Sequence, residues 1–101
     1  MTEFNDTSFD ERVAANVNLF NEQRNSVPPH NVAASAAFAA ARYTVWATAA
    51  QMASGSDLAA RRQEALDTFA NGYRQMLEEH LDDFIANYNT YFQPQPGVIT
   101  R

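Results

Sequence analysis

The alanine-rich stretch between residues 32 and 53 constrains the fold of this 101-residue chain more than any other feature. It contains eleven alanines and a single charged side chain, that of Arg42. Alanine has the highest helix propensity and is depleted in strands. Elsewhere the chain has only three glycines and no sustained alternation of apolar and polar residues. The sequence therefore predicts an all-α protein.

The four prolines mark the boundaries of the predicted helices, because proline lacks an N–H group and has a fixed φ angle. They occur as Pro28-Pro29 and as Pro94 and Pro96, outside every helical pattern. The patterns between them predict three helices, at about residues 8–25, 31–54 and 57–92.

Residues at the ends of these segments support the boundaries. Ser8 followed by Glu11 matches a capping box, in which a hydroxyl and a carboxylate satisfy free N–H groups at a helix start. We expect Asn31 to cap the second helix and Gly55 to end it.

An apolar stripe runs along the last predicted helix. Its members recur at intervals of three and four residues: Leu66, Phe69, Tyr73, Met76, His80, Phe84, Tyr88 and Tyr91. The phase is unchanged across Asn71-Gly72, a pair that elsewhere indicates a turn. We therefore expect one long helix with at most a bend at Gly72, and a break there is the alternative.

These helices carry more apolar surface than one short chain is expected to cover. The second helix is apolar on more than one face, and the last has its densest aromatic content after residue 76. We expect a single domain, with an arm at 1–7 and an extended tail at 93–101, whose antiparallel bundle is completed by a homodimer or tetramer. The expected interface residues are Met76, His80, Phe84, Tyr88 and Phe92.

Composition disfavours several classes of function. The chain has no cysteine, which excludes disulfides and thiol chemistry. Its seven basic residues are all scattered arginines and its net charge is −5, so no nucleic-acid partner is expected. The acidic N-terminus resembles no secretory leader, and we expect a cytoplasmic protein. The alanine-rich stretch is long enough to cross a membrane, but alanine and the interspersed polar residues argue against membrane insertion.

Four residues are weak candidates for a ligand site: Arg42, Trp46, Tyr73 and His80. Each also has a structural explanation, as an ion pair for Arg42, aromatic packing for Trp46 and Tyr73, and an interface histidine for His80. The surroundings of His80 lack the Glu-x-x-His pattern of helical metal sites, so we expect no metal and no cofactor. No nucleophile and base occur in a recognisable arrangement, and we expect no enzyme.

Two segments, Ala39-Ala-Ala-Arg-Tyr-Thr-Val-Trp46 and Tyr73-Arg-Gln-Met-Leu-Glu-Glu-His-Leu-Asp-Asp-Phe-Ile-Ala-Asn-Tyr88, resemble an uncharacterised family of small bacterial proteins, mainly from proteobacteria. The segment Asn18-Leu-Phe-Asn-Glu-Gln23 is similar to the opening of that family, although His80 stands where a polar amide is common. The resemblance implies no activity. It implies that the family's characteristic residues are Arg42, Tyr43, Trp46, Tyr73, Arg74, Glu78, Glu79, Asp82 and Asp83.

Two charge pairings follow from these residues. Arg74 and Glu78 are one helical turn apart, and such a pair contributes about 0.2 to 0.5 kcal/mol when it is exposed. Arg42 is a candidate partner for the acidic cluster on the last helix. The sequence thus favours a non-catalytic, homo-oligomeric helical module. The alternative is a binder of a small ligand or metal at an inter-helix site near Arg42, Trp46 and His80.

Overall fold

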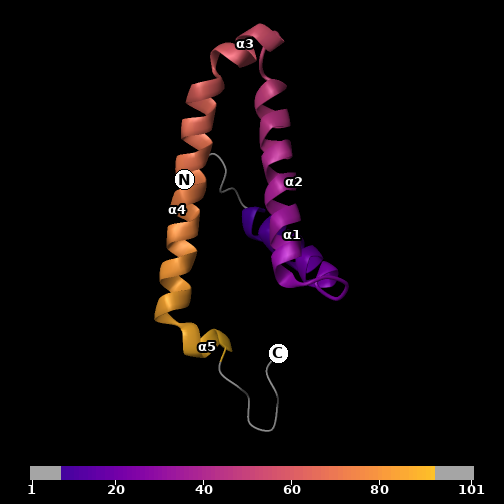
Figure 1. The fold of residues 1–101 in the computed structure, drawn as a ribbon, viewed down its shortest axis with the longest axis vertical. Helices are drawn as coiled ribbons and strands as arrows, with labels where there is room; N and C mark the ends of the chain where they lie inside the picture. The colour runs from indigo at the N-terminus through magenta and orange to yellow at the C-terminus, as the bar shows by residue number, and fades with distance from the viewer. Residues whose placement is uncertain (1–7, 93–101) are drawn as a thin grey trace. The chain divides into compact units, whose positions relative to one another are not determined.

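The computed structural model describes residues 8–92, which are all-helical and contain no strand. The helices are α1 (Phe9–Gln23), α2 (Pro29–Ala49), α3 (Gly55–Ala60), α4 (Arg62–Ala86) and α5 (Tyr88–Phe92) (Figure 1). The predicted all-α class is confirmed for this part of the chain. The predicted count of three helices is wrong, because the described residues form five. The predicted arm at 1–7 and tail at 93–101 lie outside the described residues.

The chain divides into two units, each of which is described by itself. The first unit, Met1–Met52, contains α1 and α2, which contact each other. The second unit, Ala53–Arg101, contains α3, α4 and α5, and both short helices contact α4.

The start of α1 differs from the expected capping box. Ser8 occupies the N-cap position, but its side chain makes no capping hydrogen bond to the helix. Its hydroxyl oxygen instead accepts a hydrogen bond from the guanidinium Nη1 of Arg12 at 3.2 Å. A side chain one turn into the helix has therefore taken the acceptor that a capping box would use.

The second helix begins at Pro29, so the prediction that Asn31 caps it is wrong. Pro28 is the N-cap, with φ −62° and ψ 153°, because a residue before proline is forced into extended conformation. Proline is favoured at the first helical position, where its φ is already helical and no N–H group is needed. The N–H of Asn31 donates to the carbonyl of Pro28 at 3.0 Å, inside the first turn.

The end of α2 also differs from the prediction, because the helix stops at Ala49 and Gly55 begins α3. After Ala49 the chain tightens, and the N–H of Met52 donates to the carbonyl of Ala49 at 3.0 Å. Ser54 is extended, and its hydroxyl oxygen accepts from the N–H of Asp57 at 3.2 Å. This serine cap starts a new helix and explains why the alanine-rich helix does not continue to residue 54.

The long helix continues through Asn71-Gly72, as its hydrophobic phase predicts. It is interrupted instead at Arg61, with φ −101° and ψ 8°, and at Asn87, with φ −120° and ψ 25°. At the second position the backbone N–H and the side-chain amide of Asn87 both donate to the carbonyl of Asp83, at 2.9 and 3.1 Å. Asparagine is also a weak helix former. The residue types around Arg61 do not account for the first interruption.

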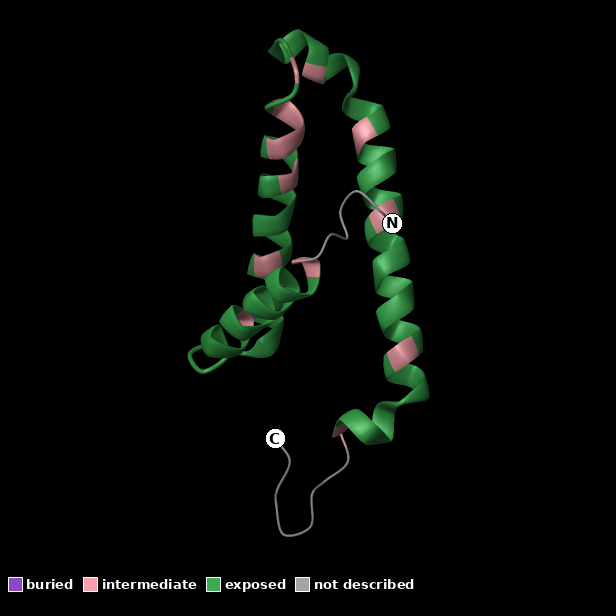
Figure 2. Cartoon of the chain, turned by 180° about the vertical axis from the view of Figure 1, so that it is seen from behind, coloured by how far each residue is buried: buried purple, intermediate pink, exposed green. Residues whose placement is uncertain are grey.

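The described residues bury almost no apolar side chain completely. Figure 2 shows exposed residues over most of the length of the helices. Val32, near the start of α2, is buried with 6% of its surface exposed, and it is the only such residue in the described range. Eighteen large apolar or aromatic side chains are exposed, so each unit is held together by local helix contacts and not by a filled core.

Replacing Gly72 by alanine tests the continuity of α4. Apart from the neighbouring backbone of α4 itself and the residues next to it in the chain, no atom lies within 4 Å of a Cβ at this position. Glycine in a helix interior costs roughly 0.5–1 kcal/mol relative to alanine. We expect Gly72→Ala to raise the free energy of unfolding by about that amount in urea titrations followed by circular dichroism. Gly55→Ala, at the first residue of α3, is the control and should have a smaller effect. A loss of stability in Gly72→Ala would contradict an uninterrupted, uncrowded helix at this point.

Candidate functional site

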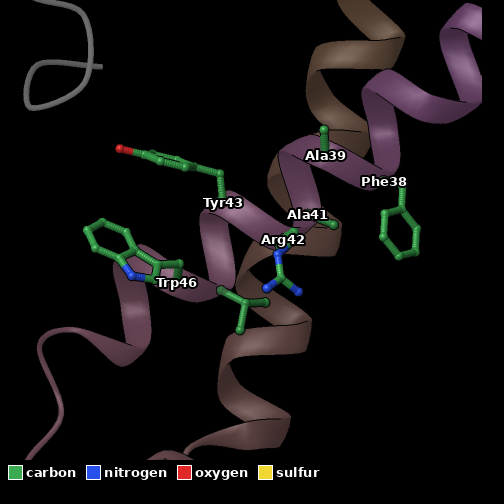
Figure 3. A pocket seen from close by; sticks show the side chains of 7 residues that line it. Phe38, Ala39, Ala41, Arg42, Tyr43 and Trp46 are labelled. Atoms are coloured by element: carbon green, nitrogen blue, oxygen red, sulfur yellow. The ribbon is translucent and has the colours of Figure 1, made fainter.

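The first candidate surface lies on α2 and consists of Phe38, Arg42, Tyr43, Val45 and Trp46, which we call the α2 face. With Ala39 and Ala41 these residues line a shallow hollow (Figure 3). Because all seven come from two turns of one helix, the hollow is a feature of the helix surface. Phe38 is 76% exposed and Trp46 is 61% exposed, so the face is open to a partner.

Arg42 lies between aromatic side chains of the α2 face. Figure 3 shows it with Phe38 on one side and the rings of Tyr43 and Trp46 on the other. Those two rings contact each other with centroids 5.5 Å apart and an interplanar angle of 32°. No carboxylate pairs with Arg42 among residues 8–92. The face therefore combines apolar area with one uncompensated positive charge.

The four predicted ligand-site residues fall into two groups. Arg42 and Trp46 line the hollow on α2, in the first unit, whereas Tyr73 and His80 are exposed residues of α4, in the second unit. Within the first unit, the structure thus places Arg42 and Trp46 on one surface. Within the described range, no three histidine, aspartate or glutamate side chains are placed to hold a metal ion.

The second candidate surface is the apolar stripe of α4, which we call the α4 seam. It comprises Leu66, Phe69, Tyr73, Met76, Leu77, His80 and Leu81, and every one of these residues is exposed. Beside it, Arg74 Nε lies 3.4 Å from Glu78 Oε2, as the one-turn spacing predicts. Both side chains are exposed, so this pair contributes only a few tenths of a kcal/mol.

At its C-terminal end α4 meets α5 in a cluster of four aromatic residues, Phe84, Tyr88, Tyr91 and Phe92, which we call the aromatic hook. The ring of Tyr91 stacks on Phe84, with centroids 4.1 Å apart and an interplanar angle of 13°. Phe92 contacts Tyr88 at 4.8 Å and Phe84 at 6.3 Å between centroids. The turn at Asn87 makes these contacts possible, because it directs α5 back against the end of α4.

Asp83 anchors the hook by hydrogen bonds. Its carboxylate accepts from the hydroxyl of Tyr91 at 2.6 Å and from the side-chain amide of Asn87 at 2.8 Å. The hydrogen bond from Tyr91, and then that from Asn87, hold the pKa of Asp83 below its usual value. The same bond to Asp83 raises the pKa of Tyr91. The charged aspartate and the neutral tyrosine are thus the forms that the closed hook favours.

The hook corrects the prediction of one continuous stripe. Tyr88 and Tyr91 were expected to extend the helical face beyond Phe84, but the interruption at Asn87 places them on a separate short helix. The five expected interface residues are divided accordingly, with Met76 and His80 along α4, and Phe84, Tyr88 and Phe92 in the hook.

Sequence reasoning missed the hydrogen-bonded group of Asp83, Asn87 and Tyr91. The available indication was the i, i+4 spacing of Asp83 and Asn87, because an asparagine at that distance can bond both the side chain and the backbone of the earlier residue. The pattern alone does not place a helix end, because Asn16 makes the same bond to the carbonyl of Arg12 at 2.9 Å within α1.

Within residues 8–92, no helix combines the length and the apolar character that are needed to cross a bilayer. The described residues form amphipathic and alanine-rich helices whose apolar side chains are largely exposed. A family model described as a protein of unknown function, DUF3144, matches residues 9–85, and the chain belongs to this family. No curated protein and no solved structure matches the chain. The matched range includes the α2 face and the α4 seam and ends before the turn at Asn87.

Replacing Tyr91 by phenylalanine tests the hydrogen bond in the hook. The variant keeps an aromatic ring for stacking on Phe84 but cannot donate to Asp83. We expect the pKa of Asp83 to rise in an NMR titration of its carboxyl carbon, while remaining below its usual value because Asn87 still donates. Tyr88→Phe removes a hydroxyl from the same cluster without touching Asp83, and it should leave that pKa unchanged. An equal shift in both variants would contradict the assigned bond.

Closure of the aromatic hook should also depend on pH, and it should weaken at both low and high pH. The pKa of Asp83 is lowered on folding, so its contribution is present above its unfolded pKa and is lost as pH falls through the folded value. The pKa of Tyr91 is raised, so its contribution is present below the ordinary tyrosine pKa and is lost as pH rises through the raised value. We expect ring contacts between Tyr91 and Phe84 in NMR spectra to weaken at both extremes. Contacts that persist unchanged in both ranges would show that stacking alone holds the hook closed.

Proposed function

We propose that this protein is a non-catalytic helical module that acts by association with further copies of itself, which together complete an antiparallel bundle. The observation that carries this proposal is the near absence of a core. Among the described residues one side chain is buried, whereas eighteen large apolar or aromatic ones are exposed. Exposed apolar patches of this extent are typical of protein–protein interaction sites.

The energy balance supports association. Fixing the backbone of one residue costs roughly 1–2 kcal/mol, whereas full burial of one large apolar side chain contributes about 1.5–3 kcal/mol. The helices therefore need many buried side chains to be stable, and Val32 supplies one. Helices in proteins gain most of their stability from packing of an apolar face, and here those faces are available on α2 and α4. Additional copies would supply the missing contacts.

The proposal also includes a cytoplasmic location and a binding role without catalysis. The chain contains no cysteine, which fits a protein of the reducing bacterial cytoplasm. The exposed residues of both faces are mainly aromatic and aliphatic, which fits a binding role better than a chemical one.

The proposal is tested by the mass of the protein in solution. We expect sedimentation equilibrium at micromolar concentrations to give two or four times the chain mass of 11.3 kDa. Because association and folding are coupled, the unfolding midpoint should rise with protein concentration. A folded species of 11.3 kDa whose stability is independent of concentration would overturn the proposal.

A substitution on the α2 face tests whether this face is part of the interface between copies. Phe38 is 76% exposed, so Phe38→Ser removes few contacts from a single chain. If further copies cover this residue, losing its burial costs about 1.5–3 kcal/mol and raises the dissociation constant by roughly 10- to 100-fold. Ala40→Ser, on the opposite side of α2, is the matched control and should leave the constant almost unchanged. Equal constants for both variants would exclude the α2 face from the interface.

A second candidate function is binding of a small aromatic anion in the hollow on α2. It is supported by the position of Arg42 beside exposed aromatic rings, with no carboxylate paired to it in the described range. His80 is a residue of the second unit, so this candidate depends on the α2 face alone.

Fluorescence can separate this candidate from self-association. Trp46 is the only tryptophan of the chain, so its emission reports occupancy of the hollow directly. We expect benzoate to quench it saturably in the native protein and only weakly in Arg42→Gln, because the neutral side chain lacks the charge that holds an anion. Identical titration curves for the two proteins would rule out an anion site at Arg42.

A further inference from the structure

The spacing of apolar residues on α4 matches the seam of a coiled coil. Leu66, Phe69, Tyr73, Met76 and His80 follow one another at intervals of three, four, three and four residues. They lie on one uninterrupted helix, Arg62–Ala86, and all five are exposed. Such spacing keeps one face turned toward a partner helix over two heptads.

Charge is distributed unevenly along the same helix. Residues 61–74 carry three arginines and two carboxylates, whereas residues 75–86 carry four carboxylates and no arginine. The acidic half contains Glu78, Glu79, Asp82 and Asp83, and only Glu78 has an arginine partner among the described residues. The N-terminal half has a net charge of +1, with Arg61 Nη1 3.7 Å from Glu64 Oε1 on the exposed surface, and the C-terminal half has a net charge of −4. The first half therefore complements the second half of another copy of the same helix.

We propose that the α4 seam binds the α4 seam of a second copy in antiparallel orientation. This inference depends on the self-association proposed above and names its interface. When two α4 helices run in opposite directions about a two-fold axis level with residues 74 and 75, Phe69 lies opposite the second copy's His80 and Tyr73 lies opposite its Met76. Arg62 then lies about one turn from the second copy's Asp83, and Arg61 lies about one and a half turns from it.

The parallel arrangement of the same two helices is disfavoured by charge. It would place the four carboxylates of one copy beside the same four of the other, and like charges at such positions repel. The antiparallel pair avoids this and is isologous, so both copies use the same surface and the assembly closes as a two-fold dimer. Both complementary halves belong to α4 itself, so the charge pattern favours a second copy of this helix as the occupant, and coverage by α2 is an outcome that the test below detects.

Cysteine cross-linking tests the orientation, because the native chain has no cysteine to interfere. The Phe69→Cys and His80→Cys proteins carry tags of different length, so that mixed and like disulfides differ in mass. The two proteins are refolded together and the mixture is oxidised. The antiparallel pair predicts a mixed disulfide between residue 69 of one copy and residue 80 of the other. In this pair, identical cysteines lie about 16 Å apart along the axis, too far for a disulfide. A parallel pair would instead link each cysteine to its counterpart.

A second pair of substitutions keeps the test valid if the loss of Phe69 prevents association. Ala70→Cys, beside the seam, and Leu77→Cys, at its margin, leave Leu66, Phe69, Tyr73, Met76 and His80 intact. They should also give the mixed disulfide when the helices are antiparallel. Sedimentation of the reduced proteins is measured first, so that each cross-linking result refers to a species of known mass.

The outcomes separate this inference from the proposal on which it depends. An associated protein that yields mixed disulfides supports both. An associated protein that yields like-to-like disulfides, or none, overturns the antiparallel α4 interface and leaves self-association standing, as it would if α2 covered the seam. A monomer overturns both.

A charge variant gives an independent measurement. Arg61→Glu combined with Arg62→Glu should weaken association about tenfold, the sum expected for several exposed ion pairs, and the effect should shrink at high salt. Arg24→Glu, in the first unit, is the control for the change in net charge. Equal effects of the two variants would overturn the assigned pairing of the α4 charges.

Discussion

The shortage of buried apolar surface governs the rest of this structure. Local hydrogen bonds and propensity determine where each helix begins and ends, but they contribute little to the stability of short helices in water. The contacts that normally stabilise a helix involve its apolar face, and here the faces of α2 and α4 point to solvent. The local structure is consequently determined by short-range contacts, and the self-association proposed above would add the packing that these faces lack.

The predictable part of the fold is the part that depends on neighbours in sequence. The all-helical class follows from alanine content, and the passage of α4 through Gly72 follows from an unbroken apolar phase. The errors occurred where two local preferences compete. Pro29 supplied a better helix start than the asparagine two residues later, and Ser54 capped a new helix where the adjacent glycine had suggested an end. Such a competition is decided by a single hydrogen bond, and hydrophobic periodicity, which extends over many residues, does not detect it.

The same distinction applies to the candidate site. Arg42 and Trp46 share one surface because they are one helical turn apart, which sequence shows directly. Grouping them with Tyr73 and His80 required knowledge of how two separate units meet, and no sequence spacing contains it. The Asp83 network is an intermediate case, because its i, i+4 element is local but the stacking of Tyr91 on Phe84 depends on the turn at Asn87.

The turn at Asn87 also limits the length of the α4 surface that is available for pairing with another copy. A continuous helix would have carried Tyr88 and Tyr91 along the apolar stripe and lengthened the surface available for pairing. The interruption at Asn87 instead directs aromatic rings onto Phe84, and Asp83 fixes one of them through a hydrogen bond of 2.6 Å. The fold-back thereby shortens the helical face that two antiparallel α4 helices can share. Ile85, Tyr88 and Tyr91 remain 73%, 59% and 49% exposed, so the end of α4 and the hook present an apolar surface of their own beyond that face.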